Sequence, residues 1–478
     1  MSWFAAPQYW FARLAFERGL AVIYLIAFVA AARQFRGLLG ERGLLPIPGY
    51  LRRVTFWQAP SLFQFRYSDR LFAAVAWSGA ALAGALAGGL GDALPLWACM
   101  LAWLVLWAWY LSIVNVGQVW YRFGWETLLL ETGFLAVFLG PAGTQPPVLT
   151  LWLLRWLLLR VEFGAGLVKL RGDRCWRDLT CLRYHHETQP MPGPLSWFFH
   201  HLPGPLHRAE AAGNHVAQLI APLVLFTPQP AAGLAAAVII VTQLWLVASG
   251  NFAWLNWLTI VLALSAVDTS VAGRVLPLPR AGRLAPAPPW YQALVLALTV
   301  VVAVLSYRPA RNLLSRHQVM NTSFDPLRLV NTYGAFGSIT RRRHELVIEG
   351  TSDRQVTPQT RWQEYEFYGK PGDPRRWPPQ VAPYHLRLDW LMWFAGLSTA
   401  YAGPWLMPLL QRLLTGDREV LRLLRVNPFP GSPPAAIRVS RYRYQFTSWR
   451  QLRHTGAWWH RERVGEVVPP VTLSVAGG

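Results

Sequence analysis

The stretch LWLLRWLLLRVEFGAGLVKLRGDRCWRDLTC, residues 151–181, joins a strongly apolar run to a short polar and aromatic segment. Its apolar part, 151–170, is long enough to cross the hydrocarbon core of a bilayer as a helix. Arg155, Glu162 and Lys169 follow one another at seven-residue intervals, so they share one face of such a helix. The stretch therefore predicts a membrane helix with a charged stripe that leaves the bilayer after Lys169.

The composition of the whole chain indicates a membrane protein. Hydrophobic residues make up 53% of the 478 residues, charged residues only 14%, and Trp occurs 26 times. Since soluble domains are about 25% charged, a bilayer must accommodate part of this apolar surface. The net charge of +21 would also suit nucleic acid, but no nucleic-acid-binding module is present. Basic loops beside apolar stretches contact anionic head groups, so we expect the lipid bilayer and no nucleic acid as a partner.

Apolar stretches of spanning or near-spanning length recur through the first part of the chain. Several are shorter than the ~20 residues of a spanning helix, so neighbouring stretches can merge. We expect a polytopic α-helical membrane protein with about eight or nine spans. The stretches are 20–33, 71–90, 94–116, 126–141, 147–170, 214–227, 231–249, 253–268 and 289–307.

After residue 307 the sequence becomes polar and rich in Pro, with alternating strand-like patterns. We expect 1–307 to form a multi-span helical membrane domain with its loop 171–213 on the external face. We expect 308–478 to form a soluble C-terminal α+β domain on the external side, with a β-sandwich-like core. The predicted strands are 344–350, 362–368 and 442–448, and the predicted helices are 388–397 and 418–425.

The orientation in the membrane follows from the span count. Nine spans with a cytoplasmic N-terminus place the loop after Lys169 and the C-terminal domain together on the non-cytoplasmic side, which is the orientation we expect. The positive-inside tendency opposes it, because a group of arginines then also lies outside. These are Arg33, Arg36, Arg42, Arg52, Arg53, Arg66 and Arg70.

Two predicted spans carry charges that we expect to form one intramembrane polar cluster. Ions in lipid cost ~3 kcal/mol or more each near the centre, so they should face one another or a cavity. One interpretation is a structural ion-pair network, and the other is a binding or catalytic cavity with Lys169 as the base. Gly164 and Gly166 would allow close approach of either a helix or a ligand. The cluster comprises Glu126, Glu131, Arg155, Arg160, Glu162 and Lys169.

The chain has only three cysteines, so it is not a disulfide-rich scaffold. Cys99 lies in an apolar stretch and is interpreted as a packing residue. Cys175 and Cys181 form a disulfide if their loop faces an oxidising compartment, and otherwise are two packing cysteines. The five intervening residues do not fit the C-x2–4-C spacing of common zinc sites, so we expect no metal and no cofactor despite several nearby histidines.

Long blocks of this sequence resemble the lipase maturation factor family over nearly the whole chain. The blocks include VGQVWYRFGWETLLLETGFLA (116–136), KLRGDRCWRDLTCLRYHHETQPMPGPLSWFFHHLP, SGNFAWLNWLTIV, SRHQVMNTSFDPLRLVNTYGAFGSITRRRHELVIEGT and WWHRERVGEVVPP. The resemblance implies a multi-span protein of the endoplasmic reticulum membrane that assists folding of secreted lipases, with client binding by its lumenal C-terminal domain. It also implies that the first span is an uncleaved anchor, because RGLLGERGLLP, directly after it, looks like the family's own beginning.

The Arg-, Ala-, Pro- and Trp-heavy composition and short loops favour a bacterial member of this family, located in the inner membrane. A eukaryotic member would lie in the endoplasmic reticulum membrane.

A weaker resemblance links the membrane half to vitamin K-dependent γ-carboxylases and related horizontally transferred transmembrane domains. The segment FGAGLVKLRGDRCW carries it and implies Lys169 as a catalytic base. Those carboxylases place a histidine shortly after a Trp in an earlier span, whereas Trp125 is followed here by Glu126 and Thr127. Carboxylase chemistry is therefore in doubt.

Two functions follow from these resemblances. The favoured one is a membrane-anchored, chaperone-like maturation factor for exported enzymes such as lipases, without enzyme activity of its own. The alternative is a membrane enzyme acting on a lipid, quinone-like or peptide substrate. Aromatic side chains dominate interface hot spots, so aromatics of the C-terminal domain are the predicted client contacts. They are Trp362, Tyr365, Trp377, Trp458 and Trp459.

Overall fold

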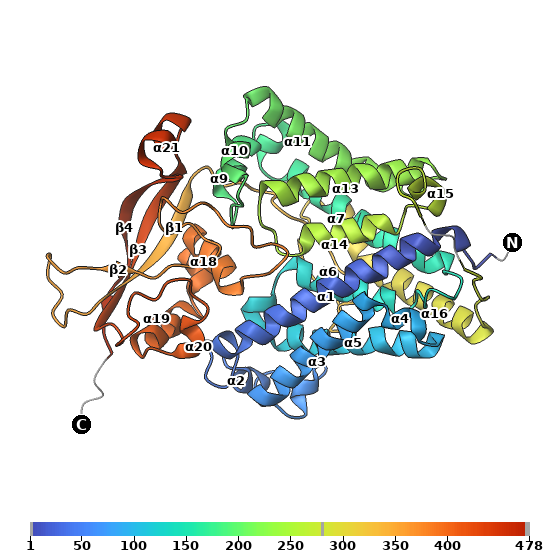
Figure 1. Cartoon of the computed structure of the whole chain (residues 1–478), viewed down its shortest axis with the longest axis horizontal. Helices are drawn as coiled ribbons and strands as arrows, with labels where there is room; N and C mark the ends of the chain where they lie inside the picture. The colour runs from blue at the N-terminus through green and yellow to red at the C-terminus, as the bar shows by residue number, and fades with distance from the viewer. Residues whose placement is uncertain (1–2, 279–281, 474–478) are drawn as a thin grey trace.

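The computed structural model describes residues 3–278 and 282–473. A helical half holds the N-terminus, and a smaller part built around a sheet lies at the opposite end (Figure 1). The helical half contains η1 (Pro7–Tyr9), α1 (Trp10–Leu38), α2 (Ile47–Leu51), η2 (Leu62–Gln64), α3 (Asp69–Gly88), α4 (Leu90–Ala93), α5 (Leu96–Val116), η3 (Gln118–Tyr121), α6 (Gly124–Ala136), α7 (Val148–Arg171), α8 (Arg174–Arg177), α9 (Leu182–Thr188), α10 (Ser196–His200), α11 (Gly204–Leu219), α12 (Ala221–Val224), α13 (Ala231–Ser249), α14 (Leu255–Leu264), α15 (Thr269–Ala272), α16 (Pro289–Leu305) and α17 (Tyr307–Leu314).

Within the described residues, five helical segments are long and apolar enough to cross a membrane. The expected eight or nine spans are therefore not confirmed. Of the other predicted spans, α6 and α14 have only 13 and 10 residues, short of the ~20 that a hydrocarbon core requires. The helix α7 has 24 residues but carries buried charges along its length. The five segments are Pro7–Leu38, Asp69–Gly88, Leu96–Val116, Ala231–Ser249 and Pro289–Leu314.

Small residues let the first helices pack closely. A Cβ on Gly79 of α3 would lie 2.5 Å from the Phe28 ring of α1, so only glycine fits between these two helices. The N-terminus of α3 is capped by Ser68, whose side chain accepts a hydrogen bond from Leu71 N at 3.1 Å. On the outside of the helical half, α13 and α16 expose apolar side chains such as Val241 and Val304, as expected for helices that face lipid.

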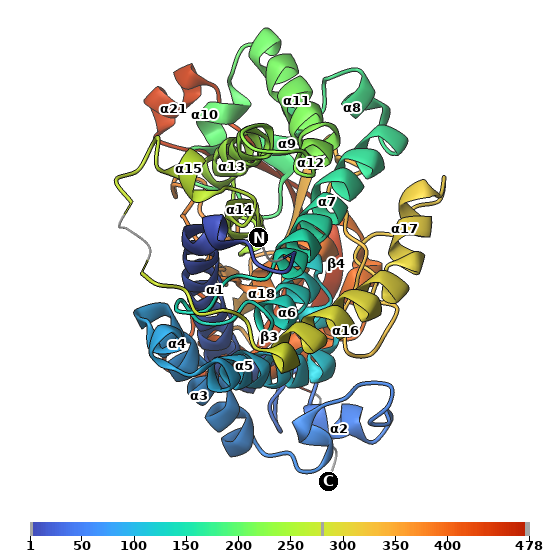
Figure 2. The ribbon, with the colours of Figure 1, turned by 90° about the vertical axis from the view of Figure 1, so that its right-hand side faces the viewer.

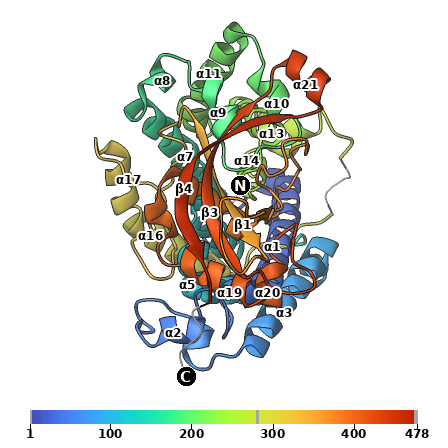
Figure 3. The same ribbon diagram turned by 90° about the vertical axis from the view of Figure 1, so that its left-hand side faces the viewer.

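The described residues of the C-terminal part form one antiparallel sheet of four strands in the order β2-β1-β3-β4. Figure 3 shows this sheet at the end of the molecule, with the helical half behind it. The strands are β1 (Arg343–Thr351), β2 (Gln363–Glu364), β3 (Ala436–Phe446) and β4 (Trp459–Val471). The helices are α18 (Arg387–Leu397), η4 (Thr399–Ala402), α19 (Leu406–Leu414), α20 (Arg418–Leu421) and α21 (Trp449–Thr455).

The prediction of a β-sandwich-like core is wrong for the described residues, which form a single sheet. The apolar face of that sheet, with Ile348 and Val439, packs against helices, and α18 lies between the sheet and the helical half (Figure 1). The opposite face carries ion pairs such as Glu349 with Arg438 at 2.9 Å. A sandwich needs apolar side chains there to pack on a second sheet.

The predicted elements of this part are confirmed unevenly. The strands expected at 344–350 and 442–448 fall in β1 and partly in β3, and the helix expected at 388–397 is α18. The strand expected at 362–368 shrinks to the two residues of β2, and the helix at 418–425 ends early, at Leu421. The long edge strand β4 was not predicted.

The two parts share one continuous set of buried apolar residues, which extends from Phe16 in α1 to Val439 in β3. Close contact also joins α1 to α20, since a Cβ on Gly37 would lie 2.7 Å from the Glu419 carbonyl oxygen. The helical half and the C-terminal part therefore form one packed unit.

Candidate functional site

The helix α7 positions four of the six charged residues that were predicted to cluster in the membrane. Its sequence is rich in Leu and Arg, which are strong helix formers, and it packs against α11, α14 and α16 (Figure 2). None of the six side chains is more than 5% exposed. The structure does not bring them together in one cluster, and most contact partners from other helices or from the C-terminal part. The six are Glu126, Glu131, Arg155, Arg160, Glu162 and Lys169.

Glu131 of α6 and Arg160 of α7 form a buried ion pair that also holds the C-terminal part. Glu131 Oε2 accepts hydrogen bonds from Asn331 N at 3.0 Å and from the Tyr333 hydroxyl at 2.7 Å. Arg160 Nη1 donates to the Asn331 carbonyl oxygen at 2.7 Å. This group of four residues, the first junction, ties the 331–333 segment to two helices of the membrane half.

Glu126 of α6 pairs with a residue far away in the sequence. Arg387 Nη1, on α18, donates to Glu126 Oε1 at 2.5 Å, and both side chains are 0% exposed. The Tyr110 hydroxyl donates to the other carboxylate oxygen, and His385 Nδ1 lies 3.3 Å from Oε1. Arg387 also donates to the Trp120 carbonyl oxygen at 3.0 Å. This second junction fixes α18 on the helical half.

Arg155 has no carboxylate partner among the described residues. Its Nη1 donates to the Leu225 carbonyl oxygen at 3.2 Å. Its guanidinium lies 5.2 Å from the ring centre of Tyr9 and 5.7 Å from that of Trp152. The positive charge of Arg155 is therefore stabilised by a carbonyl oxygen and by two aromatic rings.

Lys169 and Glu162 line a cavity of about 590 Å³. The Lys169 ammonium donates to Asn214 Oδ1 and Gln218 Oε1 of α11, each at 2.8 Å. Glu162 Oε1 accepts from Gln243 Nε2 of α13 at 2.6 Å. Both charges are therefore held by amide side chains. The cavity lies beneath the segment 316–338 and next to α18, where the two parts of the chain meet.

The two glycines before Lys169 serve packing. A Cβ on Gly164 would lie 2.6 Å from the Tyr333 carbonyl oxygen, and one on Gly166 would lie 2.6 Å from the Leu219 side chain. These positions let α7 approach the 331–333 segment and α11 closely. Of the two explanations offered by the sequence, close packing of the chain is the one this geometry shows.

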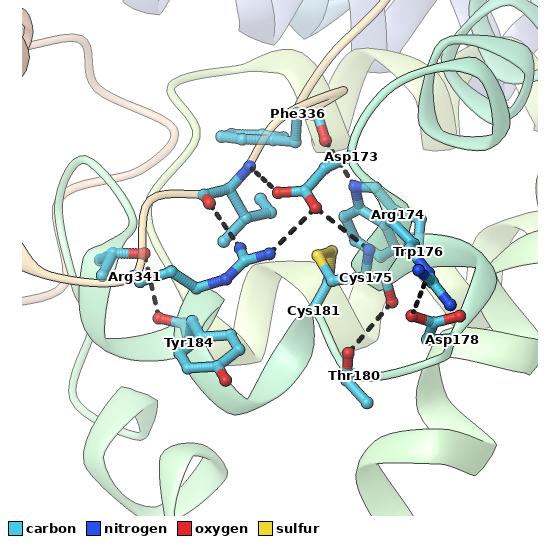
Figure 4. Close-up of a disulfide and its surroundings, with 12 residues drawn as sticks. Asp173, Arg174, Cys175, Trp176, Asp178, Thr180, Cys181, Tyr184, Phe336 and Arg341 are labelled. Carbon is cyan, nitrogen blue, oxygen red and sulfur yellow. Dashed lines mark hydrogen bonds and ion pairs between the residues drawn. A yellow bond between two sulfur atoms is a disulfide. The ribbon is translucent and has the colours of Figure 1, made fainter.

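Cys175 and Cys181 form a disulfide in the loop that follows α7 (Figure 4). Asp173 caps α8 by accepting from Cys175 N at 3.1 Å and also accepts from Arg341 Nη2 at 2.9 Å. Burial acts to raise the pKa of Asp173, but these hydrogen bonds outweigh it and lower the pKa below the ordinary value. The Trp176 indole donates to the Phe336 carbonyl oxygen at 2.8 Å. The loop is thus fastened to the 336–341 segment.

The polar stretch after the disulfide packs on the sheet. Arg343 of β1 donates to the carbonyl oxygens of Glu187 and Pro190, each at 3.0 Å. The Trp197 indole of α10 donates to the Thr447 carbonyl oxygen at 2.8 Å. The segment that follows the charged helix α7 and the disulfide therefore packs against the C-terminal part.

Three side chains of metal-ligand type lie close together in this region, where the sequence predicted no metal site. The ligand atoms of His186, His207 and Glu210 lie within 4.8 Å of each other. Glu210 already accepts from the Trp245 indole at 2.6 Å, and its other oxygen lies 3.4 Å from His186 Nε2. Burial acts to raise the pKa of Glu210, but the neighbouring imidazoles and the indole outweigh it and lower the pKa to about 2. The group connects α9, α11 and α13.

The predicted client contacts differ in accessibility. Tyr365 and Trp459 are buried, and Trp362 is half-buried beneath the Arg438 guanidinium, 4.2 Å from its ring centre. Trp377 is 54% exposed, and it stacks on the half-buried Trp458 with ring centres 5.7 Å apart.

Two further aromatic residues extend this exposed pair. Trp449 of α21 is 51% exposed and Phe198 of α10 is 38% exposed. Phe198 lies 5.9 Å from Trp449 and 6.2 Å from Trp458, measured between ring centres. We call Phe198, Trp377, Trp449 and Trp458 the aromatic patch. Sequence reasoning missed Phe198 and Trp449, although PLSWFFHHLP and TSWRQL each show clustered aromatic or amphipathic residues.

The amide partners of the cavity and the partners of both junctions were also missed. Asn214 and Gln218 are four residues apart on α11, a spacing that places two polar side chains on one helix face. Gln243 stands alone in an apolar helix, which is a weaker signal of the same kind. Arg387 is 261 residues from Glu126, and no local pattern links them.

The fold and these contacts define an integral membrane protein whose helical half is joined through two buried ion-pair junctions to a C-terminal α+β domain. The family model described as lipase maturation factor transmembrane domain matches residues 11–274. The model described as lipase maturation factor C-terminal domain matches residues 329–469.

Known proteins resemble the chain over almost its entire length. Lipase maturation factor 1 of Mus musculus is 42% identical over 97% of this chain and 88% of its own. Lipase maturation factor 1 of Homo sapiens is also 42% identical, over the same shares. Lipase maturation factor 2 of Xenopus laevis is 30% identical over 97% of this chain and 82% of its own. No solved structure matches the chain. The chain belongs to the lipase maturation factor family.

These comparisons do not support two of the expectations from the sequence. The relatives are vertebrate proteins and give no support to a bacterial source. The alternative of a carboxylase-like membrane enzyme likewise has no support, since both halves match lipase maturation factor models.

Proposed function

We propose that this protein assists the maturation of an exported lipase-like enzyme and contacts that client through its C-terminal domain. The observation that carries the proposal is the 42% identity, over 97% of the chain, to proteins named lipase maturation factor 1. The activity is that of a folding factor rather than of an enzyme.

The proposed arrangement places residues 1–307 in the membrane and residues 308–478, with the loop 171–213, on the non-cytoplasmic side. The Cys175–Cys181 disulfide supports this orientation, because disulfides form and persist in oxidising compartments. The contacts of Asp173 with Arg341 and of Trp176 with Phe336 keep the loop and the C-terminal domain on the same side.

The aromatic patch is the proposed client surface. Exposed and contiguous aromatic side chains mark interaction sites on soluble surfaces, and Trp is enriched among residues that dominate binding energy. The patch lies where α10, α21 and the loop containing Trp377 meet, at the edge of the C-terminal domain. A partly folded lipase that exposes apolar surface would bury these rings.

Rescue of lipase secretion tests the proposed activity. Cells that lack their own lipase maturation factor 1 would receive a lipase that requires that factor, together with this chain. The specific activity of secreted lipase should rise above that of cells given an empty vector. A chain that reaches the membrane at normal levels and leaves the specific activity unchanged would contradict the proposal.

Substitutions in the aromatic patch test the client surface. Trp377→Ala combined with Trp449→Ala removes two exposed rings and should lower rescue, because loss of a hot-spot side chain costs about 2 kcal/mol or more of binding. Tyr401→Ala is the matched control, since Tyr401 is 55% exposed in the same domain but outside the patch. Equal rescue by the patch variant and the control would refute this surface.

A further inference from the structure

Lys169 is a buried cation that forms no ion pair with a carboxylate in the described part of the chain. It is one of only two lysines in the chain, although Lys and Arg together number 45. An ammonium has three N–H donors, and two of them bind the amide oxygens of Asn214 and Gln218. The Trp176 ring centre lies 4.9 Å from Nζ. The other lysine, Lys370, is paired with Glu345, whereas among the described residues Lys169 forms no ion pair.

The cavity beside this ammonium is large and mainly apolar. Its volume of about 590 Å³ falls within the ~300–1,000 Å³ range of small-molecule sites. Much of its wall comes from aliphatic and aromatic side chains of α7, α13, α14 and α18. Val168, Leu246, Phe252, Trp393 and Phe394 belong to this wall.

The ionisable groups around the cavity favour an anion. Four cationic side chains line it against two carboxylates. Each carboxylate already accepts a short hydrogen bond, Glu162 from Gln243 and Glu210 from Trp245, both at 2.6 Å. The cations are the buried Lys169 and the exposed Arg122, Arg171 and Arg316.

We propose that this cavity binds a single-chain amphiphile with an anionic head group, either a fatty carboxylate or the phosphate of a lysophospholipid. The head group would accept the remaining N–H of Lys169, and the amide NH₂ groups of Asn214 and Gln218 can donate to it as well. The apolar tail lies against the wall that contains Phe252 and Leu246. A buried ammonium thereby gains the counter-ion that a low-dielectric site requires. The inference does not depend on lipase maturation.

Binding of defined amphiphiles to the purified full-length protein in mild detergent tests the proposal. Radiolabelled palmitate or lysophosphatidate should bind saturably, and their relative affinities identify the head group. Hexadecanol has the same chain length as palmitate but no charge. It should bind at least about tenfold more weakly, because losing one charge-assisted hydrogen bond weakens binding by about that factor. Equal binding of hexadecanol, or saturable binding of neither anion, would overturn the proposal.

Two variants locate the site. Lys169→Met should weaken anion binding at least about tenfold, because it removes that hydrogen bond. Arg311→Met is the matched control, since it removes one positive charge from an exposed residue outside the cavity and should leave binding unchanged. Unchanged affinity in the folded Lys169→Met protein would overturn the assignment.

A measurement on the unaltered protein decides the question if Lys169→Met does not fold. Reductive methylation followed by mass spectrometry can report each of the two lysines separately. Saturating palmitate or lysophosphatidate should slow methylation of Lys169 and leave Lys370, held on Glu345, unaffected. Methylation of Lys169 at the same rate with and without these ligands would contradict the proposal.

Discussion

Arg387→Met is expected to weaken the attachment of the C-terminal domain severely. The substitution leaves Glu126 buried and without its cationic partner, since both side chains of the pair are 0% exposed. Removing one member of a buried ion pair costs about 3–5 kcal/mol. The Trp120 carbonyl oxygen also loses its hydrogen bond from Arg387, which adds about 1 kcal/mol. The substitution should therefore lower the unfolding free energy by ~4–6 kcal/mol in total.

Denaturant titration of the full-length protein in mild detergent measures this loss. Adding Glu126→Gln to Arg387→Met removes the stranded charge and should recover roughly 1–3 kcal/mol, because residues of one network couple on that scale. Arg412→Met is the matched control: its pair with Asp417, 3.4 Å long and partly exposed, should be worth less than about 1 kcal/mol. A single variant as stable as the control, or additive effects in the double variant, would refute the structural role of this junction.

Three further outcomes follow from the structure. Cys175→Ser opens the small ring closed with Cys181 and should lower the unfolding free energy by about 2 kcal/mol in the same titration, an effect that reductant should reproduce in the parent protein. Gly164→Ala places a Cβ 2.6 Å from the Tyr333 carbonyl oxygen and should cost about 1–3 kcal/mol, so an unchanged denaturation midpoint would speak against this packing. Burial raises the pKa of Asp389 from its ordinary 3.8 to about 6, so the folded state favours its protonated form and loses that stabilisation as pH rises from about 4 through 6. Asp389→Asn should therefore flatten the fall in melting temperature over that window, and a parallel fall in both proteins would contradict the assignment.

Much of the architecture could be predicted because hydrophobic patterning is a local property. The apolar runs of α1, α3, α5, α13 and α16 each correspond to a predicted span. The count of eight or nine spans is not confirmed, because apolar character does not separate a spanning helix from a buried one. The helices α6 and α14 are short and packed inside the protein. Length distinguishes these cases only after the ends of each helix are known.

The charged residues singled out by the sequence are buried in the fold, but their partners could not be predicted. Seven-residue spacing placed Arg155, Glu162 and Lys169 on one face of α7 and suggested mutual pairing. In the folded chain each contacts a different element. Arg155 binds the residue that follows α12, Glu162 binds α13 and Lys169 binds α11.

The C-terminal domain shows the same limit. Alternation identified β1 and part of β3, but it does not reveal that helices rather than a second sheet cover the apolar face. The exposed strand β4 has a polar, arginine-rich sequence with two prolines near its end, so its pattern differs little from that of a loop. The aromatic patch joins α10 and α21, about 250 residues apart, and only the fold brings them together.

The most direct test of the account is site-specific photo-crosslinking in cells that make both this protein and a dependent lipase. A photoreactive amino acid would replace Trp449 in the aromatic patch or, as control, Tyr401 outside it. The account predicts a crosslink to newly made lipase from position 449 and little from position 401. Equal crosslinking from both positions, or none from position 449 while secreted lipase activity is restored, would contradict the central claim that the patch receives the client.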